Sequence, residues 1–102
     1  MTIPAPGECR DMAQVRAAVS ELDHEIIRML GRRLDYVREA VRYKPDEDSI
    51  RNPGHLERFF GDRRKWAAEA GYDPAVVEAI YRTLYDYTVR VQLELHRAKT
   101  GG

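Results

Sequence analysis

The chain has 102 residues, of which 43% are hydrophobic, and its 17 Lys and Arg residues balance 17 Asp and Glu residues. This length predicts one domain near the lower limit for a self-sufficient core, and the composition is typical of a folded chain rather than a disordered one. Because its formal net charge is zero, the chain lacks the broad positive field that attracts nucleic acid and anionic membranes, and we expect neither as a partner.

The single cysteine, Cys9, has no partner for an internal disulfide. No segment has the ~18 apolar residues of a membrane span, and no signal-peptide pattern is present. These features predict a protein of the reducing cytoplasm.

Residues 1–10 contain two prolines and a glycine, and we expect them to form a flexible leader. Asp11 and Gln14 have the spacing of a capping box, which predicts that a helix begins at about Met12. Apolar residues then recur with helical spacing, which predicts one long helix to about Tyr43. Those apolar residues are Val15, Val19, Leu22, Ile26, Leu30, Val37 and Val41.

Pro45 ends this helix, because proline has no amide hydrogen and disfavours helical geometry in the residue before it. The polar stretch Pro45–Arg51 is the one clear internal loop that the sequence predicts. Asn52 and Pro53 then supply a cap and a first-turn proline for a second, shorter helix.

Gly71 predicts the end of the second helix near Ala70. Asp73 and Pro74 repeat the start signal and predict a third helix that ends near Ala98. The apolar face of this third helix consists of Val77, Ile80, Leu84, Val91 and Leu95.

These elements predict an all-α fold of three helices, one long, one short and one medium, in a single domain at residues 11–99 with a flexible tail at residues 100–102. A first helix of about 32 residues spans ~48 Å, which is longer than a compact domain of this size is wide. Two shorter helices cannot cover its apolar stripe, so we expect a homodimer. An elongated monomeric hairpin is the alternative.

Two cations lie on the apolar face of the long helix. At ~100° per residue, Arg33 is about 20° from the stripe centre at Ile26, and Lys44 is almost on that centre. A buried unpaired charge costs several kcal/mol, so both cations either have carboxylate partners or await an anionic ligand. Lys44 has a third option, because it lies at the helix end and can reach water.

Two further polar residues lie at the borders of apolar faces. Arg16 is about 80° from the stripe centre of the first helix, and Gln92 is about 80° from Leu84 on the third. Side chains at such positions usually face solvent.

Motifs for metal or cofactor chemistry are absent from the sequence. The three histidines are far apart and have no metal-ligand spacing, and no glycine-rich phosphate loop is present. We therefore expect neither a metal nor a cofactor.

Three segments carry a family resemblance: VRAAVSELDHEIIRMLGRRLDYVREAVRYK, RRKWAAEAGYD and YRTLYDYTVRVQLELHR. Within them are an Arg in V-R-x-x-V-x-x-L-D, the second Arg of G-R-R, a Lys eleven residues later and a Gln in the last helix. From about Met12 to Arg97 the chain resembles the all-helical chorismate mutases, in particular the isochorismate pyruvate lyases of salicylate and siderophore biosynthesis. The resemblance implies an intertwined homodimer of that type.

By this resemblance, Arg33, Lys44 and Gln92 line the pocket of one subunit, and Arg16 enters it from the partner subunit. Arg33 and Arg16 would bind the two carboxylates of a chorismate-like substrate, while Lys44 and Gln92 would face its ether oxygen. Such a pericyclic reaction requires positioning and electrostatic stabilisation, but no nucleophile. The other residues assigned to substrate contact are Val37, His55, Leu56 and Thr88.

His55 and Leu56 stand where mutases of this family usually carry Arg-Glu, whose Glu accepts the ring hydroxyl of the substrate. Leu56 cannot accept a hydrogen bond and so resembles the lyases. His55 departs from both patterns. It could itself bind a carboxylate in its charged form, or Arg51 or Arg58 could replace the missing arginine.

The resemblance therefore implies elimination of pyruvate from isochorismate to give salicylate, by concerted hydrogen transfer and with weak chorismate mutase activity. We expect the loop after Lys44 to order over the substrate. A chorismate or aminochorismate mutase is the second hypothesis. A non-catalytic helical dimer that binds a regulatory acid or a partner protein is the third.

Overall fold

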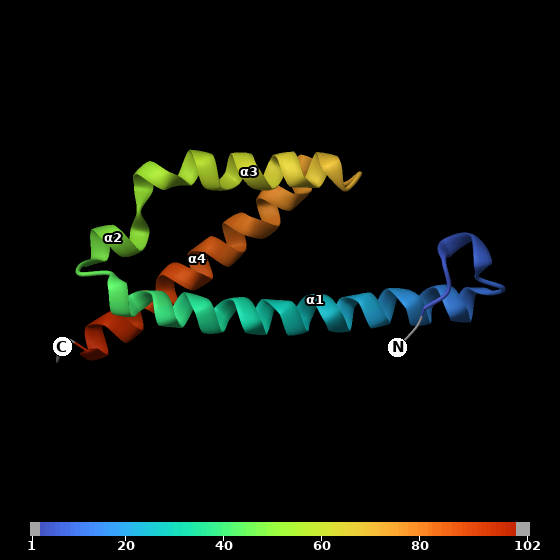
Figure 1. Cartoon of the computed structure of the whole chain (residues 1–102), viewed down its shortest axis with the longest axis horizontal. Helices are drawn as coiled ribbons and strands as arrows, with labels where there is room; N and C mark the ends of the chain where they lie inside the picture. Colours follow the sequence, from blue (N-terminus) through green and yellow to red (C-terminus); the bar gives the residue numbers. More distant parts are fainter. Residues whose placement is uncertain (1–2, 100–102) are drawn as a thin grey trace. The chain divides into compact units, whose positions relative to one another are not determined.

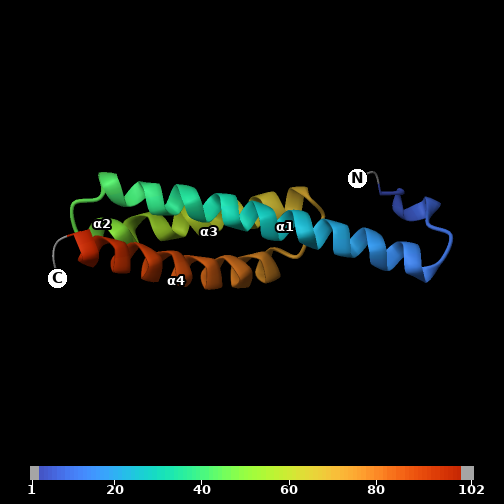
Figure 2. The same ribbon diagram turned by 90° about the horizontal axis from the view of Figure 1, so that it is seen from below.

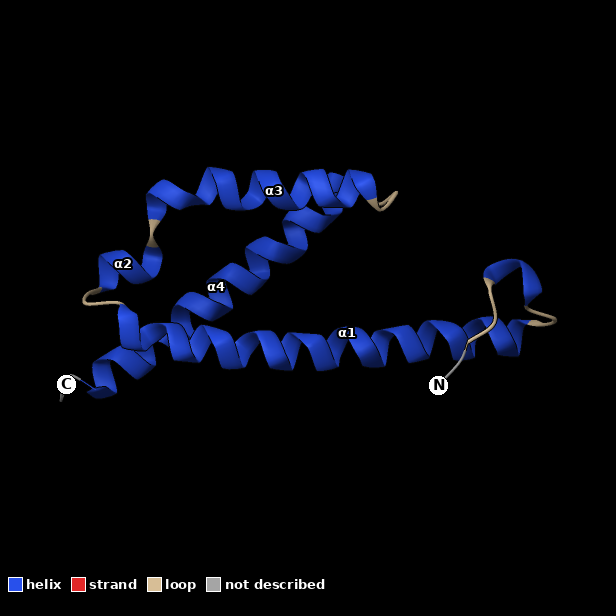
Figure 3. Ribbon diagram, in the orientation of Figure 1, coloured by secondary structure: helices blue, strands red, loops and turns tan. Residues whose placement is uncertain are grey.

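The computed structural model describes residues 3–99, in which all regular elements are helices (Figures 1 and 3). The three longest are α1 (Met12–Ala40), α3 (Leu56–Glu69) and α4 (Pro74–Lys99). They confirm the predicted all-α class with its three main helices. The shorter elements are η1 (Pro6–Glu8), η2 (Val41–Tyr43), α2 (Glu47–Arg51) and η3 (Pro53–His55).

The chain divides into two compact units, Met1–Asp35 and Tyr36–Gly102. The predicted leader includes the 3-10 helix η1, while the predicted tail at residues 100–102 lies outside the described residues. A single domain at residues 11–99 stays a prediction.

The first unit contains most of α1, which begins as predicted after Asp11, although the Gln14 side chain binds the amide of Arg10 and not that of Asp11, as a capping box requires. The amide of Gln14 donates to Asp11 Oδ1 at 2.9 Å, and the Gln14 side chain accepts from the amide of Arg10 at 2.8 Å. The predicted apolar stripe of α1 is exposed in the single chain, with Leu22 51% and Ile26 50% accessible. This face therefore has no cover within the described residues of the first unit.

The second unit contains the hairpin of α3 and α4 (Figures 1 and 2). Gly71 ends α3 with a φ of 74°, which favours glycine, and the amide of Tyr72 donates back to the carbonyl of Ala67 at 2.8 Å. At the start of α4, Asp73 Oδ1 accepts from the amide of Ala75 at 2.9 Å. Both predicted signals between these helices are confirmed.

The core of the second unit is small and joins η2 and α2 to the hairpin. Buried apolar side chains come from η2, α2, α3 and α4, and the described examples are Val41, Ile50, Phe60, Ala67 and Leu93. Because η2 and α2 each contribute to this core, the segment that follows α1 is packed against α4 rather than free.

Two predictions about the segment after α1 are wrong. The α-helix ends at Ala40 and continues as the 3-10 helix η2, rather than running to Tyr43. The predicted loop Pro45–Arg51 contains α2, which begins with a capping box between Asp46 and Ser49. Such a box satisfies the free amides of the first turn and so stabilises even a five-residue helix.

The second predicted helix also begins later than expected. Asn52 does precede a turn with Pro53 at its first position, but that turn is the 3-10 helix η3, and Asn52 makes no side-chain cap. Its backbone is left-handed, with a φ of 43°, because it ends α2 instead. The long helix α3 starts only after His55.

None of the described helices is both long and apolar enough to cross a membrane.

Candidate functional site

Lys44 lies directly after η2, in extended backbone with a φ of −113° and a ψ of 112°. Its ammonium donates to Gln92 Oε1 on α4 at 3.0 Å. Within the described part of the second unit, no carboxylate forms an ion pair with it, and burial lowers the pKa of Lys44 below its ordinary value of 10.5. The cation is therefore half-buried, and the described residues of its own unit supply no neutralising charge.

Gln92 is 5% exposed, and both ends of its carboxamide are bound. Nε2 donates to the carbonyl of Val37 at 2.8 Å, while Oε1 accepts from Lys44. Val37 lies in the last turn of α1, and a backbone carbonyl has two lone pairs, so that it can accept a hydrogen bond from a side chain beside any bond within its helix. The helix end thus orients the carboxamide so that its oxygen faces the ammonium.

Lys44 and Gln92 have further N–H groups that these two hydrogen bonds do not use. An ammonium has three N–H groups, and Lys44 gives one to Gln92. A carboxamide nitrogen has two, and Gln92 gives one to Val37. The remaining hydrogens are those with which Lys44 and Gln92 can bind an anionic or ether oxygen.

Gln92→Leu is expected to lower turnover of the substrate about a hundredfold, because Lys44 loses the acceptor that positions it. The free energy of unfolding should also fall, by about 1–3 kcal/mol, since the Val37 carbonyl and the Lys44 ammonium each lose a partner. Steady-state kinetics and urea unfolding measure the two effects. Unchanged turnover in a folded variant would show that Gln92 has no part in the site.

Arg16 and Arg33 belong to the first unit. Both lie on α1, where Arg33 is half-buried and Arg16 is exposed. The structure describes these two residues within that unit alone, so their approach to Lys44 and Gln92 stays a prediction.

Thr88 and Val37 are the predicted substrate contacts nearest to Gln92. Thr88 lies one helical turn before Gln92 on α4, is half-buried, and donates its hydroxyl to the carbonyl of Tyr85 at 2.9 Å. Its oxygen can still accept a hydrogen bond. Val37 contributes its carbonyl to the site, a role that the pattern of side chains did not indicate.

His55 and Leu56 lie at the start of α3. His55 is exposed, and its ring meets that of Phe59 edge to face at 6.1 Å, while Leu56 is half-buried. Among the described residues, no hydrogen bond, ion pair or ring contact joins either of them to Lys44 or Gln92. The structure thus brings Lys44, Gln92 and Val37 together, with Thr88 adjacent.

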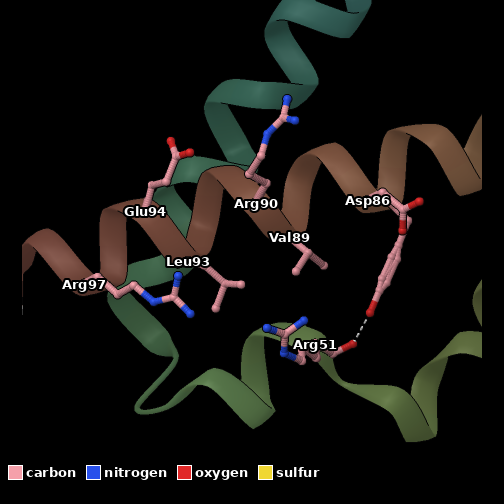
Figure 4. A pocket seen from close by; sticks show the side chains of 8 residues that line it. Arg51, Asp86, Val89, Arg90, Leu93, Glu94 and Arg97 are labelled. Atoms are coloured by element: carbon pink, nitrogen blue, oxygen red, sulfur yellow. Dashed lines mark hydrogen bonds between the residues drawn. The ribbon is translucent and has the colours of Figure 1, made fainter.

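A separate cavity of about 350 Å³ lies between α2 and α4 (Figure 4). The predicted catalytic and substrate-binding residues do not line it. It lies beside α2, where the Tyr85 hydroxyl donates to the carbonyl of Arg51. Its lining residues are Arg51, Tyr85, Asp86, Val89, Arg90, Leu93, Glu94 and Arg97.

Glu21, His24 and Glu25 on α1 offer metal-ligand atoms within 4.8 Å of one another. Glu25 is already paired with Arg28 at 2.6 Å, and this pair lowers the pKa of the Glu25 carboxyl. A cation would have to displace Arg28, so the group is better explained as part of a charged helix surface.

Comparisons with known proteins identify the family of the chain. The sequence profile of the family described as chorismate mutase type II matches residues 15–93. The isochorismate pyruvate lyase of Pseudomonas aeruginosa is 32% identical over 96 residues, which are 94% of this chain and 95% of that protein. Every predicted site residue lies inside the matched range.

Proposed function

Because the chain belongs to the chorismate mutase type II family, we propose that it is an isochorismate pyruvate lyase, which eliminates pyruvate from isochorismate and leaves salicylate. The similarity to a lyase along nearly its whole length supports this reaction. The observation that carries the proposal is the half-buried ammonium of Lys44, which Gln92 holds and no described carboxylate of its unit neutralises.

Lys44 stabilises the negative charge that develops on the ether oxygen of the substrate. In the elimination, the bond between ring carbon and ether oxygen breaks while a ring hydrogen passes to the enolpyruvyl group. Negative charge accumulates on the departing oxygen, and a fixed cation in a partly dry site lowers the energy of that transition state. Gln92 positions Lys44 and can offer its second amide hydrogen to the same oxygen.

Arg33 and Arg16 bind the two carboxylates, for which planar guanidinium groups are well suited. Arg16 comes from the partner subunit of an intertwined homodimer. Support for a second copy comes from α1, on which Leu22 and Ile26 are about half exposed within one chain. A helix stripe of this kind is stable in water when another apolar surface covers it.

Val37, His55, Leu56 and Thr88 complete the substrate contacts. Leu56 supports a lyase over a mutase, because its side chain cannot accept a hydrogen bond from a ring hydroxyl. A chorismate mutase, including one that acts on an aminochorismate, is the second candidate, which the name of the matched family favours.

Incubation of the purified protein with isochorismate and, separately, with chorismate tests the proposal. We expect isochorismate to give salicylate, detected by its fluorescence, and pyruvate in equal molar amounts. Prephenate should form from chorismate much more slowly. Prephenate from chorismate without any salicylate from isochorismate would exclude the lyase and favour the mutase. Binding of both compounds without turnover would favour a non-catalytic dimer.

A further inference from the structure

The helix α2 begins three residues after Lys44 and is tied to the end of α4 by an ion pair. Arg97 donates to both carboxylate oxygens of Glu47, from Nη2 at 2.8 Å and from Nε at 3.4 Å. This bidentate geometry fixes direction as well as distance. The hydrogen bond with Arg97 is the main reason that the pKa of Glu47 lies below its ordinary value.

The other end of α2 is also attached to α4. The Tyr85 hydroxyl donates to the carbonyl of Arg51, and Ile50 is buried between these contacts. On α4, Tyr85 and Arg97 lie on either side of Gln92 in the sequence. The segment that follows Lys44 is thus held at two places along the helix that carries its hydrogen-bond acceptor.

We propose that Glu47 and Arg97 are positioning residues, whose ion pair holds the Lys44 ammonium on Gln92. Only Pro45 and Asp46 separate Lys44 from Glu47. The proline ring fixes one backbone angle, and Asp46 is held by its capping box with Ser49. A displacement of Glu47 therefore passes to Lys44 through a short, stiff connection.

The ion pair is suited to this role more than to stabilising the fold. Its side chains are 57% and 43% exposed, and exposed pairs contribute little to the free energy of unfolding. Removal of the pair should leave the protein folded. The consequence should appear in the position of Lys44, and a small shift of a catalytic group has a large effect on rate.

The first test measures the pKa of Lys44 in Glu47→Gln by NMR of the lysine side chain, without substrate. Burial is the cause that lowers this pKa in the native chain. If the ammonium moves into water, its pKa should rise toward 10.5. If Lys44 stays in place, loss of the Glu47 charge can only leave its pKa unchanged or lower it, because a nearby negative charge favours the ammonium.

The second test measures turnover of isochorismate, and this part alone rests on the proposed function. We expect Glu47→Gln and Arg97→Gln each to lower kcat roughly tenfold and to change KM less than threefold, because the bound substrate keeps its carboxylate contacts. The reversed pair, Glu47→Arg with Arg97→Glu, should recover most of the lost kcat. Arg51 and His96 also lower the Glu47 pKa, so recovery by the reversed pair assigns the effect to Arg97.

Glu39→Gln is the matched control. It removes a glutamate that is 53% exposed, lies five residues before Lys44 and pairs with Arg42 at 2.6 Å, within the same stretch of chain. This variant should leave the Lys44 pKa and kcat unchanged. An unchanged or lowered Lys44 pKa in Glu47→Gln would overturn the inference, as would unfolding of both single variants. If Glu47→Gln raised the Lys44 pKa but the native chain did not turn over isochorismate, only the proposed function would be refuted.

Discussion

Lys44→Met is expected to lower the turnover of isochorismate about a thousandfold, because the fixed cation that faces the ether oxygen is lost. Methionine keeps most of the apolar stem, so the packing around Lys44 should survive. The free energy of unfolding should change little, since the substitution removes both a half-buried charge that no described carboxylate of its unit neutralises and the donor to Gln92 Oε1, and these two effects oppose each other. Loss of activity with retained stability is the expected combination for a catalytic group.

Steady-state kinetics, circular dichroism and urea unfolding of the same preparation measure these effects. Lys65→Met is the control, because Lys65 is an exposed lysine of α3, and it should change turnover less than twofold. If Lys44→Met unfolded the protein, Lys44 would have a structural role. If it kept full activity, the proposed chemistry would be wrong.

The pKa of Lys44 adds a dependence on pH. Because burial lowers this pKa in the folded chain, kcat/KM should fall on the alkaline side at a pH below 10.5, as the ammonium loses its proton.

The same lowered pKa of Lys44 makes the free energy of unfolding depend on pH. The energetic cost of burying the charge is complete at pH values below the folded pKa, and it disappears as pH rises toward the unfolded value. Any stability advantage of Lys44→Met should therefore be largest near neutral pH and vanish above pH 10.5.

Mixing two inactive variants is expected to restore activity if Arg16 acts in the pocket of the partner subunit. Arg16→Ala and Lys44→Met should each be inactive as homodimers. After unfolding and refolding together in equal amounts, about half of the dimers should contain one chain of each kind. One of their two sites then carries both changes and the other carries none, so total activity should recover to about a quarter of the wild-type value.

Two outcomes would contradict this arrangement. Mixtures that stay inactive, although mass spectrometry shows mixed dimers, would place Arg16 and Lys44 of the same chain in one site. A monomer in sedimentation experiments would remove the dimer itself and leave the exposed α1 stripe unexplained. A mixture of Lys44→Met with Gln92→Leu is the control and should have about half the activity of Gln92→Leu alone, because those two residues contact each other within one chain and mixing restores no site.

Local chemistry in the sequence determined where most helices begin and end. Asp11 and Gln14 start α1, Gly71 ends α3, and Asp73 starts α4, as predicted. In each case the decisive hydrogen bond or backbone angle involves residues within four positions of one another, so the sequence alone contains the whole interaction. The same kind of signal was present but missed at Asp46 and Ser49, where a capping box starts α2.

The candidate site depends on contacts that the sequence does not contain. Periodicity gave Lys44 a position on a continuous helix, whereas its backbone is extended and reaches Gln92 from beyond the helix end. Gln92 occupies a border position that usually faces water, yet it is buried.

The physical reason is distance along the chain. Lys44 and Val37 meet Gln92 across 48 and 55 residues, and Glu47 meets Arg97 across 50. Such contacts exist only after η2 and α2 pack on α4, because the hydrogen-bond partners come from different helices. Short-range signals in the sequence thus determined the start of α1, the end of α3 and the start of α4, while the tertiary structure decided which polar groups are buried together and which way their donors point.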